Sequence, residues 1–96
     1  MKRTNDKTLK EAIMQYLDVR KMRRKFDETA LIAAWPELMG QAIANRTTKL
    51  YIRDKRLYIG VESAVIKQEL MMMRQQIIGK LNEHVGAVVV EALVIL

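Results

Sequence analysis

The fold of this chain is decided by residues 49–61, which read KLYIRDKRLYIGV. Apolar and polar residues alternate on both sides of Asp54-Lys55, which is the period of two that half-buried β-strands show. We therefore expect a β-hairpin with a two-residue turn. The expected cross-strand pairs are Arg53 with Arg56, Ile52 with Leu57, and Tyr51 with Tyr58.

The alternation predicts two unlike faces for this hairpin. One face is apolar and is expected to pack on the core through Leu50, Ile52, Leu57, Ile59 and Val61. The other face carries bases and tyrosines, namely Lys49, Tyr51, Arg53, Arg56 and Tyr58. A tyrosine pair beside basic residues is typical of the stacking surfaces of single-strand binders, but such a pair also stabilises a hairpin without any ligand. Both interpretations stay open.

The apolar period before the hairpin is helical. Thr8 followed by Glu11 has the capping-box pattern of a helix start, so residues 1–7 are expected to be frayed. This first helix should run to about residue 20–23, and its buried face comprises Leu9, Ala12, Ile13, Tyr16 and Leu17. A second helix over about 28–34, capped by Asp27 next to Phe26, and a third over about 36–45 are expected on either side of a break at Trp35-Pro36.

A long helix and a last strand are expected after the hairpin. Ser63 is a suitable N-cap for a helix over about 64–83, which Gly86 should end. The expected buried stripe comprises Ile66, Leu70, Met73, Ile77 and Leu81, widened by Met71 and Ile78, whereas Met72 should be exposed. Residues 88–96 are apolar and β-branched, which predicts a strand buried on both faces and parallel to the second strand. The chain is therefore expected to form one α+β domain over residues 1–96, a three-stranded sheet with helices on one face.

The composition argues against most enzyme sites. The chain has 96 residues, no Cys, one His and one Ser, so it can form neither a disulfide framework nor a zinc site of the usual kind. No partner near Ser63 in the sequence would activate it as a nucleophile. We expect no catalytic residue, no metal, no cofactor and no small-molecule substrate. No apolar run is long enough for a signal sequence or a membrane span, so we expect a cytoplasmic protein without a membrane partner.

The positive charge is concentrated near the N-terminus. The net charge is +6, and residues 1–25 hold nine Lys and Arg against three acids, whereas residues 26–96 hold eight of each. Five bases lie within six residues, at Arg20, Lys21, Arg23, Arg24 and Lys25. Such a cluster indicates a polyanion partner, nucleic acid first, although a solvated helix end has the same composition.

Several segments in fixed order resemble the DciA-like family of bacterial domains. They are WPELMGQAIA at residues 35–44, the hairpin, Val61-Glu62-Ser63 before a helix with Gln68-Glu69-Leu70, and Leu81-Asn82-Glu83. The resemblance covers roughly residues 10–96, and its fold markers here are Trp35, Pro36, Gly40, Glu69 and Leu70. This chain departs from the family pattern in three places: Val65-Ile66 replaces a frequent aromatic, Thr48 a common Pro, and Asp54-Lys55 a Gly-containing turn. The resemblance implies a KH-like module that acts with the replicative helicase and with DNA.

These observations together predict a non-enzymatic accessory protein of DNA replication. We expect it to bind single-stranded or forked DNA through the bases of residues 20–25 and the outer hairpin face, and to contact the helicase that the resemblance implies. The chain lacks the Gly-x-x-Gly loop of true KH domains, so charge and the hairpin face must serve instead. Two other functions stay open: a protein-interaction adaptor without nucleic-acid binding, and a small RNA-binding module in ribosome assembly.

Overall fold

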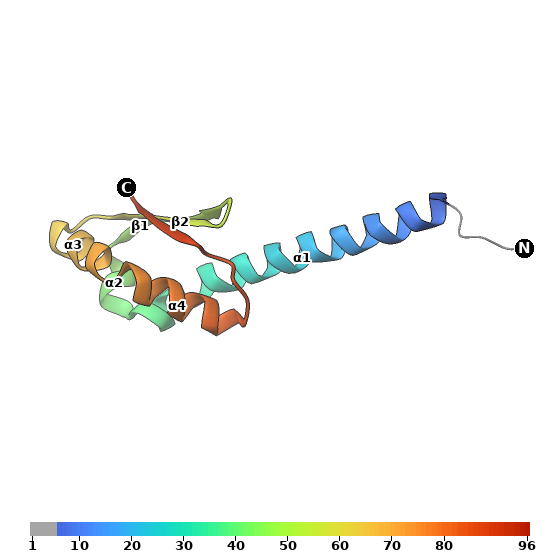
Figure 1. Ribbon diagram of the computed structural model, residues 1–96. Helices are drawn as coiled ribbons and strands as arrows, with labels where there is room; N and C mark the ends of the chain where they lie inside the picture. Colours follow the sequence, from blue (N-terminus) through green and yellow to red (C-terminus); the bar gives the residue numbers. More distant parts are fainter. Residues whose placement is uncertain (1–5) are drawn as a thin grey trace, which may run out of the picture.

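The computed structural model describes the chain from Asp6 to Leu96, with side chains from Thr8 onward. Its elements, in chain order, are α1 (Asp6–Met39), α2 (Gln41–Asn45), β1 (Thr47–Arg53), β2 (Arg56–Val61), α3 (Ala64–Met72), α4 (Arg74–Val85) and β3 (Ala92–Ile95) (Figure 1). The α+β class and the three-stranded sheet are confirmed, whereas the KH-like topology stays a prediction. The expectation of a frayed N-terminus falls mostly on residues 1–5, outside the described residues.

The sheet has the strand order β1-β2-β3. Strands β1 and β2 are antiparallel with the expected pairs Arg53–Arg56, Ile52–Leu57 and Tyr51–Tyr58. At the turn, Asp54 and Lys55 both have positive φ, 50° and 62°, which is the type I′ geometry that matches strand twist. Strand β3 runs parallel to β2, with Leu57 opposite Leu93. The parallel arrangement of the last strand is confirmed.

The core lies between the inner face of the sheet and the helices, which cover only that face (Figure 1). The sheet contributes Leu57 and Ile59, and the paired helices α3 and α4 contribute Leu70, Ile77 and Leu81. Helix α1 contributes Leu31 and Trp35, the latter only 3% exposed. Among the described residues, no helix packs on the opposite face of the hairpin, as expected from its bases and tyrosines.

Helix α1 is continuous where two breaks were expected. It runs through the basic cluster and through Pro36, and it ends at Gly40, whose φ of 93° suits a residue without Cβ. The expected end of the first helix at about residue 20–23 and the expected break at Trp35-Pro36 are therefore wrong. Pro36 removes one backbone bond close to the helix end, a loss offset by the burial of Leu31 and Trp35 on the same helix.

The first half of α1 projects from the domain, so the expected burial of its apolar face is wrong. All residues from Thr8 to Phe26 are exposed, and the molecule measures 69 Å along its longest axis against 20 and 19 Å across (Figure 1). The helix already includes Asp6, so Thr8 does not cap it. Asp27 is a buried helix residue, not an N-cap, and Phe26 is 70% exposed.

The single helix expected after the hairpin is divided in two. Ser63 caps α3 as expected, its Oγ accepting the Ile66 N–H at 3.2 Å, and Gly86 ends α4 with a φ of 71°. Between them, Met73 leaves helical geometry with a ψ of 15°. This break turns Met71 and Met73 to solvent, so their expected burial is wrong, whereas Met72 is exposed as predicted.

Strand β3 is shorter than expected because the segment before it bonds to a helix side chain. Asn82 Oδ1 accepts the N–H groups of Val89 and Val90 at 3.0 and 2.9 Å, and its Nδ2 donates to the Val90 carbonyl at 2.9 Å. Val89 and Val90 are buried by this anchor without joining the sheet. Burial of the strand on both faces is wrong, since only Leu93 within β3 is fully buried.

Asn82→Ala should lower the free energy of unfolding by about 2 kcal/mol, because three buried backbone groups lose their partner. Urea unfolding followed by circular dichroism measures the change. Gln75→Ala, at an exposed position of the same helix, is the matched control and should change stability by less than about 0.5 kcal/mol. Equal effects of the two substitutions would contradict the anchoring role.

Candidate nucleic-acid interface

The five bases of residues 20–25 lie on a straight helix where it leaves the domain. All five side chains are exposed. Arg20 donates to the Tyr16 hydroxyl at 3.3 Å and lies 5.6 Å from that ring's centre. Arg23 lies 3.8 Å from the Asp27 carboxylate. Because α1 is continuous here, these bases are held by a helix and not by a flexible loop.

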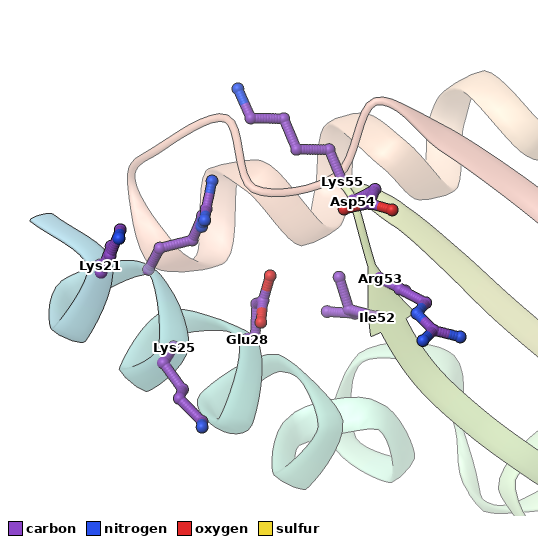
Figure 2. Close-up of a pocket in the computed structure, with 8 residues that line it drawn as sticks. Lys21, Lys25, Glu28, Ile52, Arg53, Asp54 and Lys55 are labelled. Carbon is purple, nitrogen blue, oxygen red and sulfur yellow. The ribbon is translucent and has the colours of Figure 1, made fainter.

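A groove between α1 and the tip of the hairpin brings two basic segments together. Its bases are Lys21, Arg24 and Lys25 from the helix, with Arg53 and Lys55 from the hairpin. Two acids, Glu28 and Asp54, and one apolar residue, Ile52, complete the lining. We call it the hairpin groove. Figure 2 shows Ile52 pointing toward α1, Glu28 between the helix and the hairpin, and Arg53 pointing away.

A second groove separates α1 from the segment that joins α4 to β3. It has the bases Arg20, Lys21, Arg23, Arg24 and Lys55, and one acid, Asp27. Its apolar lining comes from Leu17 and Val19 on the helix and from Ala87, Val88 and Val89 on the joining segment. We call it the connection groove. Lys21, Arg24 and Lys55 belong to both grooves, so three bases meet at the corner that the grooves share.

The outer hairpin face carries the predicted tyrosine pair. The rings of Tyr51 and Tyr58 are stacked, with centres 4.8 Å apart and planes 9° from parallel. Lys49, Arg53 and Arg56 are exposed around them. Because neighbouring residues of a strand point to opposite faces, this face is turned away from the hairpin groove. Of the ten predicted binding residues, the structure therefore brings Lys21, Arg24 and Lys25 to the hairpin groove, whereas Arg53 borders the groove but points to the outer face that carries the tyrosines.

The five fold markers of the family resemblance lie in the core, at the end of α1 and on the surface of α3. Trp35 and Leu70 are core residues, Pro36 and Gly40 lie at the end of α1, and Glu69 is exposed on α3.

Sequence reasoning missed Lys55 as a candidate site residue, since it was treated only as a turn residue. Its Nζ lies 3.4 Å from Glu91 Oε1. A base at the tip of a hairpin with a basic face was the signal that could have identified it.

Other kinds of site are not formed by the described residues. Within Asp6–Leu96, no group of three His, Asp or Glu side chains could hold a metal ion. Over the same part of the chain, no helix combines the length and the apolar content needed to cross a membrane.

Comparisons with known proteins agree on one family. The family described as "Dna[CI] antecedent, DciA" matches residues 8–95. A segment of 52 residues is 40% identical to a "UPF0232 protein" of Corynebacterium glutamicum (strain R), covering 54% of this chain and 29% of that protein. The chain thus matches less than a third of the length of that curated relative. No solved structure matches the chain.

Arg56→Glu should raise the free energy of unfolding by about 0.5 kcal/mol at low salt, because Arg53 and Arg56 are directly opposite and like charges there destabilise a hairpin. The gain should shrink in about 1 M salt, where the Debye length is about 3 Å. Urea unfolding at both salt concentrations measures it, with Arg56→Gln as the control that only removes the repulsion. A loss of stability in both variants would show that Arg56 has a stabilising contact instead.

Proposed function

The chain belongs to the DciA family, and on that premise we propose that it is a cytoplasmic, non-enzymatic accessory protein of DNA replication that binds DNA and the replicative helicase. The family is associated with helicase loading in DNA replication and is not known as an enzyme family. Its link to the replicative helicase, DnaB, comes from the same membership. The DNA-binding residues are our own assignment.

The observation that carries the DNA proposal is the hairpin groove. It gathers five bases from two segments that are distant in the sequence, against two acids. Charges of one sign in a concave site focus the electrostatic potential, which attracts a polyanion and accelerates its association. Because the groove lining contains no aromatic ring and a single apolar residue, we assign it to the phosphate backbone, without base-specific contacts.

The outer hairpin face supplies a second kind of contact. Tyr51 is partly exposed beside Lys49 and Arg53, an arrangement suited to stacking with an unpaired base and to contact with its phosphate. A single strand that passes over the hairpin tip would touch the groove on one side and the tyrosines on the other. This geometry favours single-stranded or forked DNA over a rigid duplex.

Replacing both Arg24 and Lys25 by Glu should weaken binding to a single-stranded DNA oligonucleotide by at least about tenfold at low salt. If each base contacts one phosphate, the negative slope of log affinity against log salt should become shallower by about 1.4, since each phosphate contact contributes about −0.7 on single strands. Fluorescence anisotropy at several salt concentrations measures both quantities.

The matched control replaces Lys67 and Lys80, on α3 and α4 away from both grooves, by Glu. It makes the same change of net charge and should lower the affinity much less. Equal losses in the two double variants would indicate a diffuse charge effect and remove the groove from the mechanism. A preference for RNA of the same sequence would instead favour the RNA-binding alternative.

Co-elution with the replicative helicase of the same organism tests the family role. We expect a stable complex in size-exclusion chromatography, with forked DNA strengthening it. The Arg24/Lys25 variant should retain the complex without DNA, provided that the helicase uses another surface. Absence of a complex in both conditions would contradict the helicase part of the proposal and leave the DNA part to the anisotropy measurement.

A further inference from the structure

The projecting half of α1 carries an apolar stripe with no partner in the described part of the chain. Leu9, Ile13, Tyr16 and Leu17 repeat at helical spacing, and each is 45% exposed or more. At 100° per residue, the stripe lies on the same side of the helix as Leu31 and Trp35, which are in the core. The side of the helix that packs in the core is therefore apolar again from Leu9 to Leu17, where it lies in solvent, and Arg20 and Arg24 lie on the same side between these two apolar parts.

The stripe leads directly into the connection groove. Leu17 belongs to both, and the opposite wall of the groove is formed by Ala87, Val88 and Val89. Val88 is 65% exposed, although its neighbours Val89 and Val90 are buried. The groove has a volume of about 510 Å³, which is within the range of sites that enclose several apolar groups. Apolar contact area is thus available on the helix and across from it.

The charges beside this apolar surface are almost all positive. Arg20, Lys21 and Arg24 line the groove, and its one acid, Asp27, lies 3.8 Å from Arg23. An occupant must therefore combine apolar side chains with negative charge. Nucleic acid fits this surface less well, because five apolar residues line the groove, namely Leu17, Val19, Ala87, Val88 and Val89, and a phosphate backbone has no apolar group to place against them. A second copy of the chain would cover the stripe with a helix whose own groove charges are also almost all positive, so it supplies few carboxylates for Arg20, Lys21 and Arg24.

We propose that the apolar stripe and the connection groove form a docking surface for an acidic amphipathic helix of a partner protein. The partner helix lies along α1 with its apolar side on Ile13, Leu17 and Val88. Its carboxylates pair with Arg20, Lys21 and Arg24, which follow Leu17 along the helix and line the groove. This is the helix-in-groove mode of recognition, in which apolar anchors supply affinity and flanking charges supply orientation. The inference does not rest on DNA binding.

A synthetic peptide tests the proposal with the full chain. The probe is a fluorescein-labelled helical peptide with Leu on one face and Glu on the rest of its surface. Its control is a scrambled peptide of identical composition, in which the Leu residues share no face. We expect saturable binding of the amphipathic peptide in fluorescence anisotropy and at least about fivefold weaker binding of the scrambled one.

Substitutions at exposed positions locate the contact without unfolding the domain. Leu17→Ser and Val88→Ser should each lower the affinity for the amphipathic peptide by about fivefold, which is the loss expected for one apolar anchor. Val65→Ser, at an α3 position that is 69% exposed and remote from the groove, should leave the affinity unchanged. Neither Leu17→Ser nor Val88→Ser should alter single-stranded DNA binding.

Three outcomes would overturn the proposal. Equal binding of the amphipathic and scrambled peptides, or no effect of Leu17→Ser and Val88→Ser, would reduce the surface to a non-specific basic region. Sedimentation velocity showing a dimer that Leu17→Ser dissociates would identify a second copy as the occupant. Loss of DNA binding in Leu17→Ser and Val88→Ser would assign the groove to nucleic acid.

Discussion

A short chain of hydrogen bonds fixes the direction of α1, and the exposed surfaces of the protein depend on that direction. The buried indole of Trp35 donates through Nε1 to the Thr47 hydroxyl at 3.1 Å, and this hydroxyl donates to the Ile43 carbonyl at 2.7 Å. These bonds tie α1, α2 and the start of β1 into one unit. Since Thr47 uses its hydroxyl as both donor and acceptor, the buried indole N–H is paired, and the orientation of its helix against the sheet is specified.

The continuity of α1 gives the basic cluster its position. Leu31 and Trp35 hold the second half of the helix in the core, and the regular rise of 1.5 Å per residue carries that orientation to residues 20–25. Bases on a loop would lose conformational freedom on binding a polyanion, a cost that a preformed helix largely avoids. The same continuous helix extends the apolar stripe beyond the domain, where no other residue of the described part of the chain covers it.

What the sequence predicts well is determined by neighbouring residues. The register of the hairpin, the Ser63 cap and the Gly86 helix end each depend on a few adjacent positions, and the structure confirms all three. The continuity of α1 was not predicted, because the local preference against helix before Pro36 is outweighed by burial of Trp35, a tertiary effect. The length of β3 was missed for a similar reason: Asn82 lies on another element and shows no periodic signal.

The candidate site also has a part that the sequence predicts and a part that only the tertiary structure shows. Charge counting predicts Lys21, Arg24 and Lys25 as candidate binding residues, but it cannot predict that Lys55 lies across a groove from them. That proximity requires α1 to pass the hairpin tip, which follows only from the continuous helix. The helical period of Leu9 to Leu17 was predicted correctly, but the burial of this face within the domain was not. Helical periodicity indicates that a face needs covering and not which molecule covers it.

The bases shared by the two grooves couple the two proposed ligands. Lys21, Arg24 and Lys55 line both grooves, so a carboxylate-rich helix in the connection groove lowers the positive potential that a DNA backbone meets in the hairpin groove. By thermodynamic linkage, DNA must weaken the binding of the acidic helix by the same factor. The apolar part of the docking surface, at Ile13 and Val88, lies outside this competition. A partner helix can therefore keep its apolar contacts while its carboxylates yield the shared bases to DNA, so the two ligands compete through charge and not through the whole of the docking surface.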